Sequence, residues 1–320
     1  MTEASKMYIV QKQLENLKKL AMPGKVVVIY GARRTGKTTL LKEFLKDETE
    51  SHVLVNGEDI TVRSHLSSQS VEKLVAFVGD AQLLVIDEAQ KIPQIGLNLK
   101  LIVDHMPEIR IIVTGSSSFD LARSTGEPLT GRKYTLKLFP LAQMEIGQIE
   151  KIHQTEANLE NRLIYGSYPE VVLMKDNKGR EKYLKEIVSS YLYKDILELD
   201  GIRYSAKIIR LLQLLAFQIG KEVSLSELGT SLSMSKNTVE RYLDLLEKAF
   251  VLQKLTGFSR NLRNEITKNC RYYFLDNGVR NALINNFNLL EQRNDTGELW
   301  ENYLIMERLK KQEYLEAQAN

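Results

Sequence analysis

The feature that most constrains this chain is an apolar run that ends directly in a glycine-rich segment. Residues 25–30, Lys-Val-Val-Val-Ile-Tyr, precede Gly31-Ala-Arg-Arg-Thr-Gly-Lys-Thr38, which fits the pattern G-x-x-x-x-G-K-[ST]. A short β-branched run suits a strand buried on both faces of a parallel sheet, and residues 39–45 then form a helical pattern. Strand, glycine-rich turn and helix in this order predict a loop that holds phosphate groups. The expected nucleotide-binding residues are Gly31, Ala32, Arg33, Arg34, Thr35, Gly36, Lys37, Thr38 and Thr39.

Each residue type in this loop has a physical role. Glycines let backbone N–H groups turn inward around a phosphate, and the start of the following helix adds positive potential. We expect Lys37 to reach the β- and γ-phosphates and Thr38 to coordinate Mg²⁺. No Asn-Lys-x-Asp motif for reading guanine occurs in the chain, which favours ATP over GTP.

A second apolar run ends in paired carboxylates. Residues 83–86, Leu-Leu-Val-Ile, lead into Asp87 and Glu88. Asp87 suits an outer-sphere Mg²⁺ contact, and Glu88 suits the general base that activates the attacking water. The alternative is a strand followed by a solvated acidic turn, but two motifs in the expected order argue against it. The pair therefore predicts hydrolysis of ATP as well as binding.

A third apolar run, residues 111–114, ends in Gly-Ser-Ser-Ser at 115–118. Thr114, Ser116 and Ser117 are candidates to sense the γ-phosphate or to orient water. An equally good interpretation is that residues 116–118 cap a helix.

Transition-state charge requires a cation. Arg132, in Leu-Thr-Gly-Arg at 129–132, is the first candidate for an arginine finger, in cis or from a neighbouring chain. Arg33 and Arg34 are alternatives, and an ordinary surface arginine is the competing interpretation of each.

Strand-like and helical patterns alternate as far as residue 140, which predicts an α/β fold with a parallel sheet, a P-loop NTPase domain over residues 1–140. Residues 141–205 are mostly helical, with a break at 166–170. Residues 206–285 give three helical segments and two strand-like stretches, the pattern of a winged helix-turn-helix.

The part of the chain that contains the two strand-like stretches carries a local positive charge. Residues 251–271 hold five basic residues and one acidic residue, a net +4, whereas the whole chain is only +3. Ser235 is the expected N-cap of the third helix, which also carries Glu240, Asp244 and Glu247. The basic residues favour a contact with DNA phosphates, whereas the acidic residues of the helix favour the alternative, a winged helix that binds another protein. The DNA-binding candidates are Lys236, Asn237, Arg241, Arg260 and Arg263.

Bulk features exclude several classes. No apolar run approaches the roughly 20 residues of a membrane helix, and the N-terminus lacks a signal-like apolar core. Cys270 is the single cysteine, and the four histidines are scattered without a metal-ligand cluster. A cytoplasmic location is expected.

The motifs together resemble those of a large family of prokaryotic AAA-type ATPases, which join an AAA domain to a winged helix and a C-terminal domain of uncharacterised function. The resemblance covers nearly the whole chain. The segments that carry it are 31–38, 86–93, 114–117, 129–132, 138–141, 166–170, 193–195 and 274–278.

The resemblance also implies a continuation that looks like a restriction endonuclease. Residues 297–307 look like its first helix, with Glu301 at the first acidic position. The later acidic residue and the Glu-x-Lys element are missing, so we expect no nuclease activity and a truncated domain over residues 286–320.

The leading hypothesis is an ATPase that uses ATP and Mg²⁺ and whose nucleotide state repositions the winged helix. Oligomers are compatible with it. One alternative is an ATP-liganded DNA-binding regulator with little turnover. Another is a scaffold, toxin–antitoxin-like or defence-associated, that binds a protein partner.

Overall fold

The computed structural model describes residues 8–116, 129–192, 205–256 and 270–316 of the 320-residue chain. The chain divides into two compact units. The first comprises Val10–Phe139 together with Glu313–Asn320, and the second comprises Pro140–Gln312 together with Met1–Ile9.

The first unit is built on a five-stranded sheet in the order β2-β3-β4-β1-β5. All four strand pairings are parallel. The strands predicted from the first three apolar runs are confirmed, whereas β5 was not expected. The strands are β1 (Val26–Tyr30), β2 (His52–Asn56), β3 (Leu83–Asp87), β4 (Arg110–Gly115) and β5 (Lys133–Lys137).

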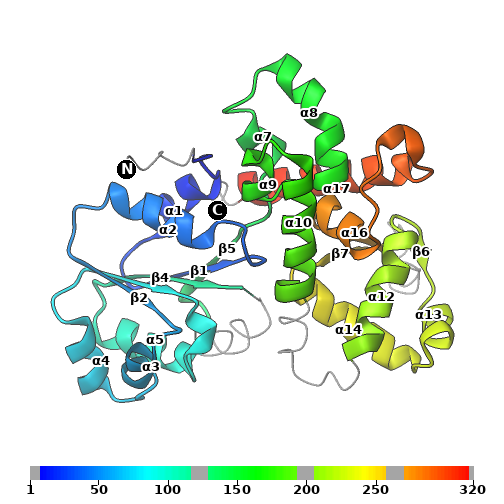
Figure 1. The fold of residues 1–320 in the computed structure, drawn as a ribbon. Coiled ribbons are helices and arrows are strands. Elements are labelled where there is room, and N and C mark those ends of the chain that lie inside the picture. The colour runs from blue at the N-terminus through cyan, green and yellow to red at the C-terminus, as the bar shows by residue number, and fades with distance from the viewer. Residues whose placement is uncertain (1–7, 117–128, 193–204, 257–269, 317–320) are drawn as a thin grey trace. The chain divides into compact units, whose positions relative to one another are not determined.

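Helices cover both faces of this sheet. Figure 1 shows α1 and α2 on one face and α3, α4 and α5 on the other. Helix α1 begins at Gln13, and a 3-10 turn, η1, follows β3. The helical elements of the unit are α1 (Gln13–Leu20), α2 (Lys37–Lys46), α3 (Ile60–Leu66), α4 (Val71–Val78), η1 (Ala89–Lys91) and α5 (Ile95–His105).

The central strands are stable because side chains of both orientations are buried. All five residues of β1 and of β3 are buried, and Val27 and Ile29 pack against Leu17, Leu40 and Leu41 of α1 and α2. Each such side chain contributes about 1.5–3 kcal/mol on leaving water. A sheet covered on both faces places all its polar chemistry at the strand ends.

The end of the chain belongs to this first unit. Tyr314 is fully buried, and its carbonyl oxygen accepts a hydrogen bond from Asn16 Nδ2 at 3.1 Å. Its hydroxyl accepts from the backbone N–H of Phe139 at 3.4 Å, and Lys137 pairs with Glu313 at 3.2 Å. Residues from both ends of the sequence thus complete one packed unit.

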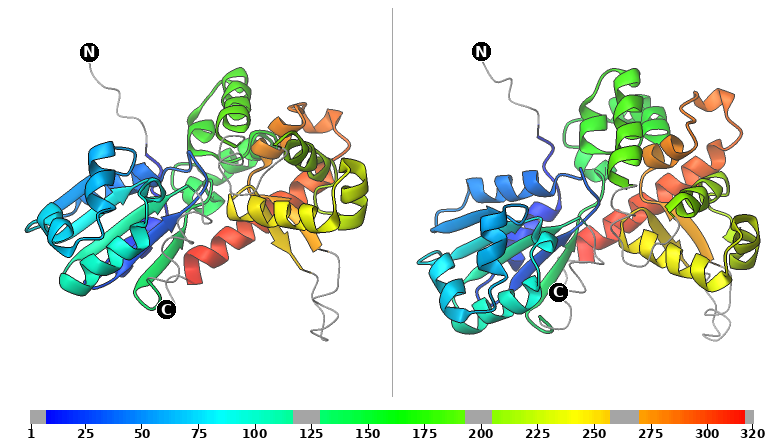
Figure 2. Two further views of the ribbon diagram at one scale, coloured as in Figure 1. Left: turned by 90° about the horizontal axis from the view of Figure 1, so that it is seen from below. Right: turned by 60° about the horizontal axis from the view of Figure 1, so that its bottom comes forward.

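The second unit is mainly helical, with one small antiparallel sheet in the order β6-β8-β7 (Figure 2). The expected break at 166–170 lies between α8 and α9, and the three expected helices after residue 205 are present. Ser235 caps the third of them by accepting from the N–H of Thr238. The elements are α7 (Gln143–Ile146), α8 (Ile152–Tyr165), α9 (Pro169–Leu173), α10 (Asn177–Glu186), the π-helix η2 (Ile187–Leu192), α12 (Ser205–Phe217), β6 (Glu222–Val223), α13 (Leu225–Leu232), α14 (Lys236–Lys248), β7 (Leu252–Leu255), β8 (Cys270–Phe274), α16 (Asn277–Leu283), η3 (Leu290–Gln292) and α17 (Thr296–Glu316).

A buried carboxylate explains two of the sequence motifs in this unit. Asp276 accepts hydrogen bonds from the N–H groups of Ser167 at 2.7 Å and Val279 at 3.1 Å, and burial raises its pKa. A Cβ on Gly166 would lie 2.1 Å from Asp276 Oδ1, and one on Gly278 would lie 2.1 Å from a backbone oxygen. The segments 166–170 and 275–278 therefore hold the α8–α9 turn against the start of α16.

Glu301 is engaged by neighbouring side chains of the same unit. Its Oε1 accepts from the hydroxyl of Tyr273 at 2.6 Å and lies 3.6 Å from Arg271 Nη1. Within the described ranges, no group of three or more His, Cys, Asp or Glu side chains could hold a metal ion. Those same ranges contain no helix with the length and apolar character needed to cross a membrane.

Candidate nucleotide-binding site

The glycine-rich loop leaves β1 at a point of close backbone approach. The N–H of Leu138 donates to the carbonyl of Tyr30 at 2.7 Å, and a Cβ on Gly31 would lie 2.2 Å from the Leu138 oxygen. At the other end of the loop, Gly36 has φ +100° and caps α2. Such a φ is strained for residues with a side chain. Both glycines therefore shape the turn that leads into the helix N-terminus.

The Lys37 side chain lies over the loop. It is only 5% exposed, and its Nζ donates to the carbonyls of Gly31 at 2.8 Å and Ala32 at 2.9 Å. An ammonium held at the mouth of a helix N-terminus adds to the positive potential there. The loop therefore fits an anionic ligand.

Gln11 supports the loop from outside, a role that was not predicted from the sequence. Gln11 is 3% exposed and donates through Nε2 to the carbonyl of Thr35 at 2.8 Å. The Thr35 hydroxyl in turn donates to the Ala32 carbonyl at 2.8 Å. Gln11 precedes α1 by two residues and has no sequence signal of its own.

The loop and the paired carboxylates meet through one hydrogen bond. Thr38 Oγ1 donates to Asp87 Oδ2 at 2.6 Å. Thr38 follows β1 and Asp87 ends β3, and β4 lies between these two strands in the sheet. Two oxygens this close fit Mg²⁺, which takes few protein ligands and completes its shell with phosphate and water. Thr38 and Asp87 are therefore the residues that would hold the ion.

Thr114 joins both carboxylate residues from the end of β4. This fully buried side chain donates to Asp87 Oδ1 and accepts from the N–H of Glu88 at 3.1 Å. Glu88 has φ +53°, in the left-handed region. A non-glycine residue in that region is uncommon, and here the hydrogen bond from its N–H helps to hold it.

Gly57 brings the end of β2 against the same turn. Its N–H donates to the Asp87 carbonyl at 2.8 Å, and a Cβ there would lie 2.4 Å from the Glu88 carbonyl oxygen. Gly57 therefore permits the Glu88 backbone to pass next to β2. The Asn-Gly pair at 56–57 resembles an ordinary turn in the sequence, so this role was missed.

Ser116 lies just beyond β4, is 5% exposed and contacts Gln90. Thr39 and Arg34 are exposed, and Arg33 is half-buried. Ser117 lies outside the described residues. The residues after 116–118, where a capped helix was the alternative prediction, lie outside them as well.

Arg132 lies at the opposite edge of the sheet. Its carbonyl accepts from the N–H of Val26, and β5, which follows it, runs parallel to β1. Arg132 therefore lies beside the amino end of β1, whereas the loop follows the carboxyl end of β1. The five residues of β1 separate these two ends by roughly 16 Å. Its Nη1 pairs with Asp104. This position argues against a role in cis, and the role in trans stays a prediction.

The described DNA-binding candidates lie on α14. Lys236, Asn237 and Arg241 are exposed, and the Arg241 guanidinium lies over the Tyr242 ring at 5.7 Å. The exposed residues Glu240 and Asp244 share this helix, so its outer surface carries both signs of charge. Arg260 and Arg263 lie outside the described residues.

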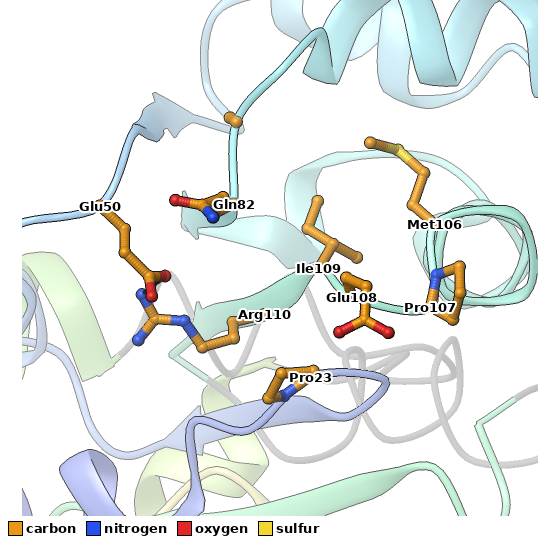
Figure 3. A pocket seen from close by; sticks show the side chains of 9 residues that line it. Pro23, Glu50, Gln82, Met106, Pro107, Glu108, Ile109 and Arg110 are labelled. Atoms are coloured by element: carbon orange, nitrogen blue, oxygen red, sulfur yellow. Dashed lines mark hydrogen bonds and ion pairs between the residues drawn. The ribbon is translucent and has the colours of Figure 1, made fainter.

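A pocket of about 630 Å³ lies at the amino ends of β3 and β4, and Figure 3 shows the side chains that line it. Met106, Pro107 and Ile109 line its apolar side, and Glu50 faces Arg110 across from them. Arg110 pairs with Glu50 at 2.5 Å, so the cation of this pocket is already engaged. The pocket lies at the edge of the sheet opposite the loop and is not part of the candidate site.

Two family models match the chain. One, described as an AAA domain, matches residues 23–147, and another, a domain of unknown function (DUF8612), matches residues 156–290. An uncharacterised protein of Mycobacterium tuberculosis is 28% identical over 286 residues, covering 88% of this chain and 61% of that protein. An uncharacterised protein of Haemophilus influenzae is 26% identical over 289 residues, covering 81% of this chain and 69% of that protein. The chain thus spans about three fifths of the length of its mycobacterial relative.

A solved structure has a similar fold. The Walker-type ATPase of Pyrococcus abyssi superposes with a TM-score of 0.56 at 16% identity, covering 85% of this chain and 93% of that one. At this identity the likeness concerns the fold alone. Together with the AAA match, it supports an AAA-type P-loop ATPase domain in the first unit.

Proposed function

We propose that this protein binds ATP with Mg²⁺ and hydrolyses it to ADP and phosphate. The observation that carries the proposal is the 2.6 Å hydrogen bond between Thr38 and Asp87. It joins the phosphate loop to the strand that ends in a second carboxylate, Glu88. A loop that only binds nucleotide needs no such carboxylate beside it.

Each residue has a distinct role in this proposal. Thr38 and Asp87 would hold Mg²⁺, which would supply positive charge at the phosphates. Lys37 adds a second positive charge, and the backbone N–H groups of residues 31–38 surround the phosphate. Glu88 accepts the proton of the attacking water, and Ser116 donates to the terminal phosphate.

We further propose that nucleotide state is coupled to a winged-helix module. The order α12-β6-α13-α14-β7-β8 with an antiparallel sheet supports this assignment. The corresponding division is an ATPase domain over 1–140, a helical subdomain over 141–205, a winged helix over 206–285 and the start of a further domain over 286–320.

Steady-state ATP turnover tests the activity. The wild type should release phosphate, Lys37→Ala should lose nucleotide binding, and Glu88→Gln should bind ATP but turn over about 10²–10⁴ times more slowly. Lys42→Ala, on the outer part of α2, is the matched control for the lysine. Normal hydrolysis by Glu88→Gln would refute the general-base role, and absence of ATP binding by the wild type would refute the proposal itself.

DNA binding is a second candidate function, favoured by the capped and exposed amino end of α14. Its mixed surface charge gives it less support than the ATPase proposal. Affinity for duplex DNA measured across salt concentrations tests it, since each lost phosphate contact lowers the salt slope by about 1. If Lys236→Ala leaves a measurable affinity and its salt slope unchanged, α14 does not contact DNA. A nucleotide-dependent protein partner recovered in place of DNA would favour the scaffold alternative.

A further inference from the structure

The side chain of Gln90 connects two parts of the candidate site. Gln90 lies in η1, directly after the carboxylate pair. Its Nε2 is 2.5 Å from Glu88 Oε2 and 3.1 Å from Ser116 Oγ. One amide nitrogen thus contacts the proposed general base and the proposed phosphate sensor at the same time.

The direction of these hydrogen bonds follows from chemistry. An ionised carboxylate only accepts, so the group next to Glu88 must be the NH₂ end of the amide. That NH₂ has two hydrogens, and the second is directed to Ser116 Oγ. A hydroxyl that accepts from an amide keeps its own hydrogen for another acceptor. Gln90 therefore makes Ser116 a donor toward its remaining surroundings.

Ser116 is well placed to use that hydrogen on a phosphate. Gly115 pairs with Tyr30 in the sheet, so Ser116 follows β4 alongside the point where Gly31 opens the loop. Glu88 meanwhile has Oε2 occupied by Gln90, and among the described residues no donor contacts its Oε1. In this arrangement Glu88 Oε1 is therefore the oxygen that accepts a proton from water.

A purely structural role explains Gln90 less well. Its Oε1 is buried and has no hydrogen-bond partner among the described residues. A buried acceptor without a partner is destabilising, because it has left water without gaining a hydrogen bond in return. An amide selected only to stabilise the turn would not leave that atom unsatisfied.

We propose that Gln90 is a positioning residue that couples recognition of the terminal phosphate by Ser116 to the orientation of Glu88. The proposal rests on the ATPase function proposed above. When Ser116 donates to the γ-phosphate of a nucleoside triphosphate, its oxygen becomes a better acceptor for the Gln90 amide. The amide then holds Glu88 with one oxygen toward the water. A diphosphate offers Ser116 no such acceptor, so the amide holds the base less firmly than it does with the triphosphate.

Two affinities and one rate test this coupling. Gln90→Met removes the donor at nearly constant volume. Dissociation constants with Mg²⁺ are measured for ADP and for the non-hydrolysable triphosphate adenylyl imidodiphosphate, alongside kcat for ATP. We expect unchanged affinity for ADP, about 3- to 10-fold weaker affinity for the triphosphate, and kcat lower by about 10- to 100-fold. Gln82→Met, at the opposite edge of the sheet, is the control and should change none of these.

The double variant separates the coupling from a local defect. Ser116→Ala alone should lower the affinity for the triphosphate by a similar factor. Gln90→Met combined with Ser116→Ala should lower this affinity no further. Fully additive effects would overturn the proposal, as would equal weakening of ADP and triphosphate by Gln90→Met. Gln90→Leu also removes the amide donor without adding charge, and it should reproduce the selective loss if Gln90→Met fails to fold. Failure of the wild type to bind either nucleotide would instead refute the ATPase proposal.

Discussion

Thr38 Oγ1 donates a hydrogen bond to Asp87 Oδ2 at 2.6 Å, and this contact joins residues 49 positions apart in the sequence. The two oxygens come from the start of α2 and the end of β3. Because the helix and the strand are both fixed by the buried sheet, neither oxygen can move far from the other. The pair is therefore preorganised in the way that the proposed Mg²⁺ site requires.

This pair predicts a selective effect on Mg²⁺. Thr38→Val removes the hydroxyl at constant shape, and we expect about 10- to 100-fold weaker binding of ATP in the presence of Mg²⁺. Binding in excess chelator should be unchanged, because the loop itself is intact. Titration calorimetry in both buffers measures this. Equal losses in the two buffers would show that Thr38 shapes the loop rather than holding the ion.

Gly57→Ala tests the close approach to Glu88. The added Cβ would lie 2.4 Å from the Glu88 carbonyl oxygen, so the turn must shift. We expect a loss of about 1–3 kcal/mol in unfolding free energy and a larger fractional loss in kcat than in ATP affinity. Gly297→Ala is the control, since its Cβ meets nothing within 4 Å. A variant with normal kcat would show that the position of the Glu88 backbone does not limit catalysis.

Arg132→Ala tests which site this arginine serves. Since Arg132 pairs with Asp104 at the amino edge of the sheet, we expect dilute protein to keep its ATP affinity within about twofold. A role in trans predicts that turnover per chain rises with protein concentration in the wild type but not in the variant. A large loss of ATP affinity at low concentration would instead restore the role in cis.

Asp295 predicts a pH dependence of stability. It pairs with the buried Arg280 at 2.5 Å and with Arg293 at 2.8 Å. Burial acts to raise the pKa of Asp295, but the hydrogen bonds and charges of Arg293 and Arg280 outweigh it and lower this pKa. The stabilisation is therefore complete above the ordinary aspartate pKa of 3.8 and is lost as pH falls through the lower folded value.

At pH 7 we accordingly expect Asp295→Asn to lower the unfolding free energy by about 3 kcal/mol, because two buried guanidinium groups lose their counter-ion. The gap to the wild type should narrow below pH 3.8. Urea titrations at neutral and acidic pH measure it. Asp244→Asn, which breaks an exposed pair with Lys248, should cost under about 1 kcal/mol at either pH. A gap that widens on acidification would contradict the assignment.

The elements predicted from sequence are those whose pattern is local. The runs that became β1, β3 and β4 are apolar throughout because both faces are buried, and each ends at a glycine or a carboxylate. β5 was missed because it is an edge strand with only Leu136 buried, and β6 is too short to show periodicity.

The missed site residues share another cause. Three of them act through contacts with residues that other elements bring near, namely Gln11, Gly57 and Gln90. No spacing pattern in the sequence predicts such contacts. Asp276 belonged to a recognised motif, yet its partner Ser167 lies 109 residues away. For Arg132 the motif suggested chemistry, and only strand direction shows which edge of the sheet it occupies. Its role in trans stays a prediction.

The hydrogen bond from Asn16 to Tyr314 joins positions 298 residues apart, within one compact unit. During synthesis the strands and the phosphate loop leave the ribosome long before Tyr314 is translated. Domains usually fold in order from the N-terminus, but this unit lacks the buried Tyr314 side chain until the chain has been made as far as residue 314. A fragment ending at residue 139 should therefore express as an incomplete domain in which Asn16 keeps its hydrogen bond to Gln13 but loses the one to Tyr314. The apolar surface that Tyr314 covers would be open to aggregation, and a separately supplied peptide carrying Tyr314 should restore the packing.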